Sequence, residues 1–383
     1  MTKAPTRTEP RTADCLEGAP HPRTSAQLFG QARAQAAFLG ALASGRLHHN
    51  WLLCGPRGIG KATFAWQIAR FLLANGKAAP ARALAAASAH GFHALDVAPD
   101  HPVARRIHAG VEPRLFAMRR TWDEKAGRLK SRITVDDVRA LGGFLTLSAV
   151  GGGHRAVIVD SADEMNPNAA NALLKLLEEP PAHTTLLLIA HQPGQLLPTI
   201  RSRCQMLRLA PLGAEDLHRA LLQAGRGEAD IQGAGAALAE LAAGSVGAAI
   251  RLIHHNGIET YTRLLSVLGE FPKMTHARAL DLAEAHAAKN SEDRFDLLMT
   301  LLDRMLARLA CTGARGRGPD VPIAAEETRT LTRLAPTLDH GRRWAQGAQE
   351  IQSTMRHGQW VHLDPAALVL DALFKMQRIA RAP

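Results

Sequence analysis

Three glycines and a lysine form a candidate phosphate-binding loop near the start of the chain. The loop follows an apolar run, has the spacing G-x-x-x-x-G-K, and consists of Gly55, Gly58, Gly60 and Lys61. In such a loop the glycines let backbone N–H groups approach a phosphate, and the lysine balances its charge. Apolar residues then recur at intervals of four and three, which predicts a helix whose N-terminus faces the same phosphate. The alternative is a glycine-rich turn between a strand and a helix that binds no ligand.

The residue after the lysine argues against a complete magnesium site. A serine or threonine normally stands there and binds Mg²⁺ through its hydroxyl, but this chain has Ala62. Thr63 does not replace it readily, because one step along a helix turns the side chain by roughly 100°. The sequence therefore predicts a nucleotide site that lacks one metal ligand.

Asp160 is a second candidate, at the end of the apolar run 156–159. Such a run is typical of a parallel strand buried on both faces, and a carboxylate at the carboxyl end of a neighbouring strand is where these sites hold Mg²⁺. A glutamate usually follows it in hydrolytic enzymes, whereas here Ser161 follows. Asp163 and Glu164 lie too far along to take that place. Alternatively, Asp160 only caps the next turn.

Strands and helices alternate in this part of the chain, which predicts a parallel α/β core. Asn166 is placed to cap a helix, with Pro167 at its first position and Pro180 after its end. Residues 184–204 begin as another apolar strand and end in the short polar run SRC.

Three strings carry a resemblance to a known family. They are the phosphate-loop spacing, NALLKLLEEPP at 171–181 and LLPTIRSRC at 196–204. Together they resemble the clamp-loader branch of the AAA+ ATPases, which includes subunits of bacterial DNA polymerase III. HPVARRI at 101–107 and WDEKAGRLKSRITVDDVR at 122–139 resemble the alphaproteobacterial form. The resemblance covers roughly residues 20–380.

The resemblance implies an architecture of an AAA+ P-loop α/β core with a parallel sheet, a small helical lid domain and a C-terminal all-α collar domain. We expect a disordered leader at 1–22, because this segment is rich in proline and mixed charge. The expected domains are the AAA+ core at 23–209, the lid at 210–255 and the collar at 256–383.

In this family the arginine of the SRC run is an arginine finger that enters the ATP site of an adjacent subunit. By position this role falls on Arg203. A guanidinium is permanently charged and forks onto phosphate oxygens, and such a finger accelerates phosphoryl transfer by roughly 10³ to 10⁵. The alternative is a structural ion pair, although Arg201 could be the arginine that pairs locally.

The chain departs from the active members of the family at further positions. They carry a threonine near the end of a strand where this chain has Ala190 and His191, and an arginine where it has Gly247. Arg251, one helical turn later, is a candidate replacement for that arginine.

No metal site is expected. Many relatives hold zinc with four cysteines, but the four cysteines of this chain never have C-x-x-C spacing. Four histidines lie in the corresponding region, and a site made of histidines alone is not expected there: His90, His93, His101 and His108.

Composition limits the class of protein and the partners that the chain can have. The chain has 383 residues, a net charge of +11 and a pI near 10.1, and no apolar run long enough for a membrane span. Scattered cysteines and the lack of a signal peptide suit the cytoplasm. Residues 105–132 carry nine basic residues against three acidic ones. This region could face DNA or an acidic partner, or be a solvated insertion.

The resemblance therefore implies a subunit of the clamp loader of the DNA polymerase III holoenzyme. In this interpretation the chain is a stator that supplies Arg203 in trans while the sliding clamp is loaded onto primed DNA during replication. Its implied partners are motor subunits of gamma or tau type and the delta subunit, and clamp and DNA through the complex.

The alternative is an active gamma- or tau-like ATPase motor that uses Lys61 and Asp160. Ala62, Ser161 and Gly247 favour the stator, so we expect little or no intrinsic ATPase activity in this part of the nucleotidyltransferase complex. No cofactor is expected to be required, although the sequence leaves weak binding of ATP or ADP open.

Overall fold

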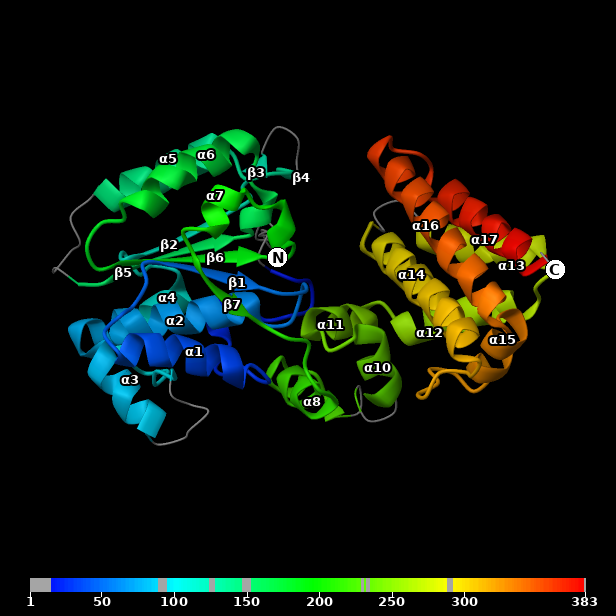
Figure 1. Cartoon of the computed structure of the whole chain (residues 1–383), viewed down its shortest axis with the longest axis horizontal. Helices are drawn as coiled ribbons and strands as arrows, with labels where there is room; N and C mark the ends of the chain where they lie inside the picture. The colour runs from blue at the N-terminus through cyan, green and yellow to red at the C-terminus, as the bar shows by residue number, and fades with distance from the viewer. Residues whose placement is uncertain are drawn as a thin grey trace, which may run out of the picture. The chain divides into compact units, whose positions relative to one another are not determined.

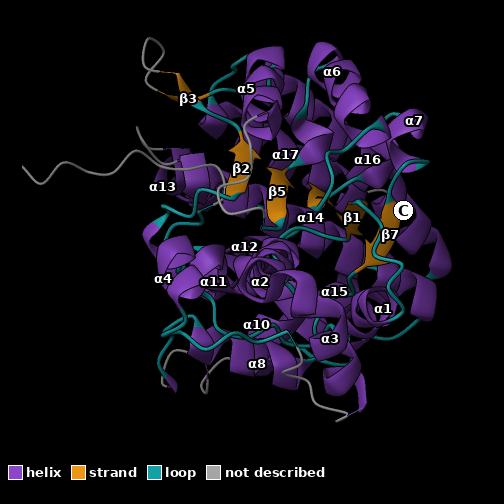
Figure 2. Cartoon of the chain, turned by 90° about the vertical axis from the view of Figure 1, so that its left-hand side faces the viewer, coloured by secondary structure: helices purple, strands orange, loops and turns teal. Residues whose placement is uncertain are grey.

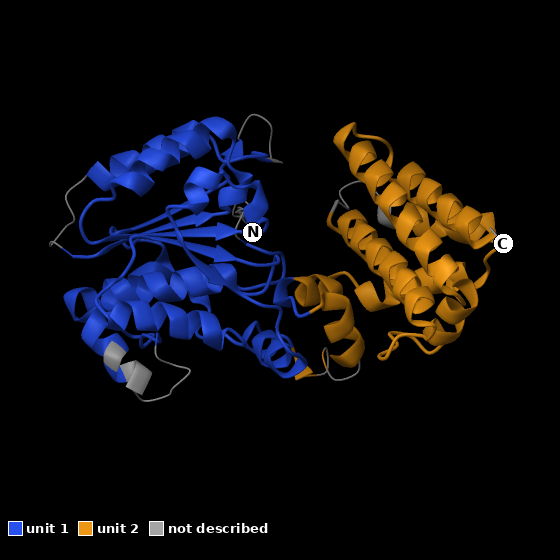
Figure 3. Cartoon of the chain, viewed as in Figure 1, with its two compact units in different colours: residues 1–226, 244–247 blue, residues 227–243, 248–383 orange. Residues whose placement is uncertain are grey.

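The chain divides into two compact units (Figure 3). The computed structural model describes residues 15–88, 95–123, 128–146, 153–228, 231, 235–287 and 292–381. The first unit contains residues 1–226 with 244–247, and the second contains 227–243 with 248–383. The expected lid at 210–255 contributes to both units. The expected leader lies outside the described residues up to position 14. The four-part division of the chain stays a prediction.

The first unit is built on a five-stranded sheet. Across the sheet the strands are β2 (Leu115–Arg119), β5 (Arg155–Asp160), β6 (Thr184–Ala190), β1 (Asn50–Cys54) and β7 (Gln205–Arg208) (Figure 2). Every neighbouring pair is parallel. Parallel strands need crossover connections, and helices supply them here. The predicted parallel α/β core is therefore confirmed.

Helices cover both faces of this sheet (Figure 1). One face carries α1 (Ala32–Ala43), α2 (Lys61–Asn75), α3 (Ala79–Ser88) and α4 (Pro102–Ala109). The other carries α5 (Val135–Thr146), α6 (Pro167–Glu178) and α7 (Pro198–Arg201). The remaining elements are α8 (Ala214–Gln223), the hairpin of β3 (Trp122–Asp123) and β4 (Arg128–Leu129), and 3-10 turns at Pro22–Thr24, Gly76–Ala78, Ala162–Glu164 and Pro193–Gln195.

Strand β1 is buried along its whole length and packs on both layers of helices. Leu52 and Cys54 belong to the core that α5 and α6 cover. Trp51 faces the opposite layer, where its ring meets Phe38 of α1 edge-on with 5.1 Å between centroids. Burial on both faces explains why this strand is a continuous apolar run in the sequence.

The predicted helix after Asp160 forms as expected. The Asn166 side chain accepts a hydrogen bond from the Ala169 N–H at 2.8 Å, and Pro167 occupies the first position of α6. The helix ends at Glu178, two residues before Pro180.

Two features of the sheet differ from the sequence interpretation. β6 lies between β1 and β5, so Asp160 does not end the strand next to the one that leads into the phosphate loop. The basic region 105–132 supplies the edge strand β2. Part of its charge is internal, because the buried Glu112 pairs with both Arg106 and Arg114 at 2.8 Å.

The described part of the second unit is helical. Its helices are α10 (Gly235–Ala242), α11 (Val246–His254, which begins in the first unit), α12 (Gly257–Gly269), α13 (His276–Ala287), α14 (Glu292–Arg315), α15 (Glu327–Leu334), α16 (Leu338–Trp360) and α17 (Pro365–Arg381). The expected all-α C-terminal region is therefore confirmed. Among the described residues no helix combines the length and the hydropathy needed to cross a bilayer.

A fully buried carboxylate joins three helices of the second unit. Glu327 of α15 accepts hydrogen bonds at 2.6 Å from the Tyr261 hydroxyl of α12, from Nε of Arg308 on α14 and from the Ile323 N–H. Burial and the charge of Glu327 raise the pKa of Tyr261 well above its ordinary value. Arg308 also pairs with the half-exposed Glu240 at 2.7 Å. Burying these charges is tolerable only because each has partners.

We predict that Glu327→Ala destabilises the protein by about 3 to 5 kcal/mol, because it leaves the charge of Arg308 in the interior without its buried partner. Glu240→Ala removes the exposed partner of the same arginine and should cost at most about 1 kcal/mol. Urea denaturation followed by circular dichroism measures both. Equal losses in the two variants would contradict the central role of Glu327.

Candidate functional site

The carboxyl edge of the sheet gathers most of the candidate residues. Gly55 directly follows β1, Asp160 ends β5 and His191 directly follows β6. The strand register places Cys54 opposite Ala190 and Asp160 opposite Ile189, so the three strands end at the same level. The loop from Gly55 to Lys61 and Asp160 therefore lie at one edge, with β6 between them.

The loop glycines are required by conformation and by space. Gly55, Gly58 and Gly60 have φ values of +148°, +74° and +97°, which side chains rarely adopt. A Cβ on Gly55 would lie 2.6 Å from the carbonyl oxygen of Leu209, and one on Gly60 would lie 2.8 Å from Leu28. The chain is therefore folded tightly around this turn, and α2 begins at Lys61.

The Lys61 ammonium is turned into the loop. The residue is only 3% exposed, and its Nζ donates to the carbonyl oxygen of Gly55 at 2.6 Å and to that of Pro56. Burial lowers the pKa of Lys61 to about 8, against the opposing effect of the carboxylates of Asp160 and Asp163. The ammonium group that should contact a phosphate is thus already hydrogen-bonded to carbonyl oxygens of the loop.

Asp160, Ser161 and His191 form a hydrogen-bonded chain beside the loop. The Ser161 hydroxyl donates to Oδ1 of Asp160 at 3.0 Å and lies 3.0 Å from Nε2 of His191. Because the hydroxyl has one proton, we assign the Nε2–H tautomer to His191, which donates to Ser161. Burial, with the charges of Lys61 and Arg57, lowers the pKa of His191 to about 4. The imidazole is therefore neutral at pH 7.

The two acids further along are engaged elsewhere. Oδ2 of Asp163 accepts from the backbone N–H groups of His191 and Gln192, at 2.9 and 2.8 Å. Glu164 pairs with Arg57 of the loop at 2.7 Å and with Arg120 at 2.8 Å. Neither carboxylate is placed to orient an attacking water.

A second turn packs directly on the phosphate loop. The Gly247 N–H donates to the carbonyl oxygen of Gly58 at 3.1 Å, and the Ser245 hydroxyl donates to that of Arg57 at 2.9 Å. A Cβ on Gly58 would lie 2.4 Å from the Ser245 hydroxyl oxygen, and one on Gly247 would lie 3.0 Å from the Gly58 Cα. The position where active members carry an arginine is therefore in backbone contact with the loop. Sequence reasoning missed this contact.

Two further polar side chains, Gln31 and Arg251, have structural partners. Gln31 is buried and joins Ile59 of the loop to Ala210, donating from Nε2 to their carbonyl oxygens at 3.3 and 2.7 Å. Arg251 lies 4.0 Å from Asp293 within the second unit. Its role as a replacement arginine stays a prediction.

Arg203 lies at the opposite, amino-terminal edge of the sheet. Asn50, the first residue of β1, donates from Nδ2 to the carbonyl oxygens of Leu177 and Arg203, at 2.8 and 3.2 Å. β1 has five residues, and each spans about 3.3 Å, so about 16 Å of strand separates this edge from the phosphate loop. The structure thus brings Arg203 together with neither Lys61 nor Asp160.

The Arg203 guanidinium is held at the surface. Its Nη2 lies 2.6 Å from Oε1 of Glu178, its Nη1 donates to the Thr199 carbonyl at 3.0 Å, and the side chain is 36% exposed. Arg201 is exposed and has no ion-pair partner among the described residues. The local pairing considered for Arg201 is therefore made by Arg203.

Metal-ligand groups do not converge in the described part of the chain: no three His, Cys, Asp or Glu side chains there could hold an ion together. His90 and His93 lie outside the described residues, while His101 caps α4 through Nδ1, which accepts from the Val103 N–H. Burial raises the pKa of the Cys204 thiol to about 12, so this cysteine is no nucleophile at neutral pH.

Comparison with known proteins shows what part of this chain resembles. Residues 30–213 match the family model described as DNA polymerase III, delta subunit. The DNA polymerase III subunit delta' of Pseudomonas aeruginosa is 43% identical over 156 residues, 41% of each chain. That of Escherichia coli K12 is 31% identical over 225 residues, which are 59% of this chain and 60% of the relative. The tau subunit of Salmonella typhimurium is 30% identical over 52% of this chain and 27% of its own length.

The chain thus spans less than two thirds of the length of these relatives. Among solved structures, a gamma-subunit-related protein of Thermotoga maritima is 16% identical over 90% of this chain and 100% of its own, with a TM-score of 0.35. A RuvB variant of the same organism reaches 0.37 at 15% identity, over 84% and 89%. Scores this low carry no functional argument. The match of residues 30–213 to this family model, the parallel sheet and the loop after β1 agree with the expected AAA+ core.

The buried lysine makes stability depend on pH in a defined window. Between pH 8 and 10.5 the unfolded chain keeps the Lys61 proton that the folded chain has released. Linkage then requires the stability of the wild type, relative to Lys61→Met, to rise with pH by up to about 1.4 kcal/mol per unit. Chemical denaturation between pH 7.5 and 10.5 measures the difference, with the exposed Lys77→Met as control. If the stability difference between the wild type and Lys61→Met did not change with pH, the lowered pKa of the buried lysine would be contradicted.

Proposed function

We propose, from the match of residues 30–213 to the family model described as DNA polymerase III, delta subunit, that this chain is a delta-prime-type subunit of a bacterial clamp loader. It acts as a stator of the polymerase III holoenzyme and hydrolyses little or no ATP itself. Arg203 enters the ATP site of a neighbouring motor subunit while the sliding clamp is loaded onto DNA. The delta' relatives support this assignment for the part of the chain that they match.

The observation that carries the trans role is the position of Arg203 at the edge of the sheet opposite the phosphate loop. About 16 Å of strand β1 lies between them, more than an arginine side chain can span. If Arg203 serves a nucleotide, the nucleotide is bound by another chain. A permanently charged, forked donor on the surface suits that task.

The ion pair between Arg203 and Glu178 is weak enough for the guanidinium to be released on assembly. Both side chains are partly exposed, at 36% and 49%, and exposed pairs contribute about 0 to 1 kcal/mol. A γ-phosphate on a neighbouring subunit therefore replaces the carboxylate at small cost. Until then Glu178 and the Thr199 carbonyl keep the guanidinium ordered near the position where it acts.

The chain's own nucleotide site supports a stator over a motor. Ala62 offers no hydroxyl to Mg²⁺, and Ser161 donates its hydroxyl proton to Asp160, the other expected metal ligand. Lys61 is bound by loop carbonyls, and Gly247 packs on Gly58. The alternative, a gamma- or tau-like motor, rests on the gathering of Lys61 and Asp160 at one edge.

The partners of this proposed subunit are gamma- or tau-like motor subunits and the delta subunit, and the sliding clamp and primed DNA through the complex. Relatives of both the delta' and the tau type each match more than half of the chain, which supports assembly among similar AAA+ subunits. In this role the protein works in the cytoplasm. The C-terminal helices serve as the collar, and neither zinc nor another cofactor is required.

We predict that the isolated protein binds ATP weakly or not at all and hydrolyses it far below the usual enzyme range of roughly 1 to 10³ per second. The reason is that both metal ligands and the water-positioning carboxylate are absent or engaged. Filter binding and release of radiolabelled phosphate measure the two properties. Turnover in the usual range that Lys61→Ala abolishes would establish the motor instead.

We predict that Arg203→Ala leaves stability within about 1 kcal/mol and slows ATP hydrolysis at the site that it serves by roughly 10³-fold or more. DNA-stimulated hydrolysis by the reconstituted complex falls by less, because the other ATP sites keep their own arginines. Clamp loading onto primed DNA is measured in parallel.

Arg201→Ala is the matched control, since it removes an exposed arginine two residues away. Normal hydrolysis and loading with Arg203→Ala, together with failure of Arg201→Ala, would show that Arg201 is the finger. Normal behaviour of both variants would leave the SRC run a structural role only.

A further inference from the structure

Three histidines gather at the amino-terminal edge of the sheet because each directly precedes a strand. His49 precedes β1, His154 precedes β5 and His183 precedes β6. These strands are parallel neighbours, so their first residues lie at one edge. All three histidines line a cavity of about 330 Å³ there. They do not form a metal site, since no three metal-ligand side chains in the described part of the chain could hold an ion together.

The buried wall of this cavity is apolar. It includes Leu42 at the end of α1, Leu72 near the end of α2 and Ala79 at the start of α3, all of them buried. The polar side chains beside this wall bond to each other, because Nε2 of His154 lies 2.9 Å from the Thr185 hydroxyl oxygen. Burial lowers the pKa of His154 to about 4, so its imidazole is neutral at pH 7. An apolar group of a ligand can therefore be buried against this wall.

The rim of the cavity carries cations. Lys77 belongs to the lining and is exposed, and the exposed Arg46 lies between two lining residues. Neither side chain has an ion-pair partner in the part of the chain that the structure describes. The exposed His49 and His183 also line the rim, and an imidazole is neutral or cationic but never anionic. None of the described residues that line this cavity is acidic.

The segments that form the cavity contain no carboxylate side chain. Residues 18–95, which supply α1, α2 and α3, have no Asp or Glu, and neither have residues 138–159 and 180–214, which supply β5 and β6 up to Val159 and Ala190. The cations at the rim therefore have no acid near them in the sequence that could neutralise them. An anion would find unpaired positive charge here, whereas a cation would find no partner.

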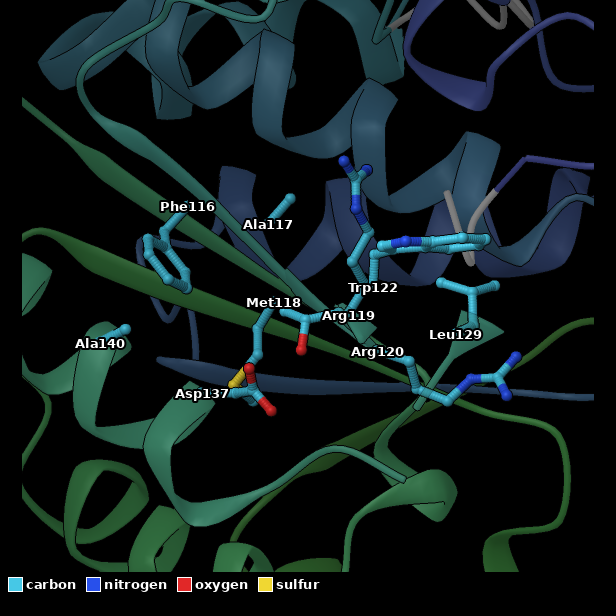
Figure 4. Close-up of a pocket in the computed structure, with 10 residues that line it drawn as sticks. Phe116, Ala117, Met118, Arg119, Arg120, Trp122, Leu129, Asp137 and Ala140 are labelled. Atoms are coloured by element: carbon cyan, nitrogen blue, oxygen red, sulfur yellow. The ribbon is translucent and has the colours of Figure 1, made fainter. Parts of the chain in front are cut away.

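The cavity along β2 shows the contrast (Figure 4). Its lining mixes the two signs of charge, because Asp137 lies there together with Arg119 and Arg120. Arg120 is also paired already, with its Nε 2.8 Å from Oε2 of Glu164. That cavity does not select the charge of a ligand, and the histidine-lined cavity does.

The carbonyl ends of α1 and α2 do not reverse this selection. The Gly45 N–H donates to the carbonyl oxygen of Leu42 at 3.1 Å, and the Gly76 N–H donates to that of Leu72. Carbonyl groups that would attract a cation are thus partly satisfied within the chain. The third helix at the cavity, α3, begins there, so its end of positive partial charge faces the same region.

We propose that this cavity binds a small organic anion, in which a phosphate or carboxylate group is attached to a compact apolar body. The anionic group lies at the rim beside Lys77 and His183, and the apolar body packs on Leu42 and Leu72. The cavity volume of about 330 Å³ lies near the lower end of the range of roughly 300 to 1,000 Å³ for ligand pockets, which favours a compact molecule.

A small molecule fits this cavity better than a nucleic acid strand. Proteins that bind single strands stack the bases on aromatic side chains, and the described residues that line this cavity include no Phe, Tyr or Trp. A duplex would present its phosphates to the rim and leave the apolar wall uncovered. A ligand that joins one anionic group to an apolar body uses both parts of the cavity.

Ligand-observed NMR titrations with the full-length protein test the proposal. The probes share one benzyl group and differ in charge: benzyl phosphate and phenylacetate are anions, benzyl alcohol is neutral and benzylamine is a cation. At least one anion should bind saturably, and the neutral and cationic probes at least about tenfold more weakly, because they lose a charged hydrogen bond. Inorganic phosphate should also bind at least about tenfold more weakly, because it has no apolar body to bury.

The two anions distinguish the source of the ligand. Preference for benzyl phosphate assigns the site to organic phosphates, and preference for phenylacetate assigns it to carboxylates. Absence of saturable binding by both anions overturns the proposal, and so does equal affinity for benzyl alcohol.

Two variants at the rim locate the site. Lys77→Glu reverses the unpaired charge and should weaken binding of the anion about tenfold or more, and His183→Ala should weaken it about threefold or more. The matched controls lie in the second unit. Lys273→Glu reverses another exposed lysine, and His362→Ala replaces an exposed histidine with the same φ of +57° as His183. Both controls should leave the affinity unchanged, and thermal unfolding checks that every variant is folded.

Unchanged affinity in both Lys77→Glu and His183→Ala, with both variants folded, overturns the location of the site. An oligothymidine that binds in a Lys77-dependent way, while neither benzyl anion displaces it, would assign the rim to nucleic acid and overturn the small-molecule ligand. None of these results depends on the clamp-loader assignment, because the experiment uses this chain alone.

Discussion

Complete burial of strand β1 is the constraint on which the rest of the first unit depends. A strand covered on both faces must satisfy every backbone group inside the sheet, so only its two ends can present polar chemistry. At the carboxyl end the chain leaves into the phosphate loop and α2. At the amino end the amide of Asn50 holds the carbonyl oxygens of Leu177 and Arg203. The phosphate loop and the proposed arginine finger are therefore placed apart by the same five residues that hold the core together.

Burial also sets the electrostatics of the carboxyl edge. It lowers the pKa of Lys61 to about 8 and that of His191 to about 4, so at pH 7 the lysine keeps its charge while the imidazole is neutral. Hydrogen bonds within the chain use the groups that a nucleotide and its metal would need, including the ammonium of Lys61 and the carboxylate of Asp160. Bound ATP would have to displace these internal partners, and the free energy of that exchange opposes binding.

The parts that sequence predicts correctly are the ones whose signals are local. The spacing around Lys61 and the cap formed by Asn166 each specify a structure within a few residues, and both form as expected. The edge strand β2 was missed because its apolar run is short and lies in an arginine-rich region. Choosing between Arg201 and Arg203 required the position of Glu178, which depends on how α6 packs. The contact of residues 244–247 with the loop joins segments almost two hundred residues apart and leaves no local pattern.

The close approach of Gly58 and Gly247 has an evolutionary consequence. Each glycine leaves the space that the other occupies, so a side chain at either position must move the partner's backbone. A codon change that placed arginine at position 247 would disturb the loop before it could help to bind a phosphate. Restoring a hydroxyl at Ala62 would likewise leave Lys61 bonded to its own carbonyls. A site with both groups would therefore need several coordinated substitutions, because no single change brings either group to a phosphate.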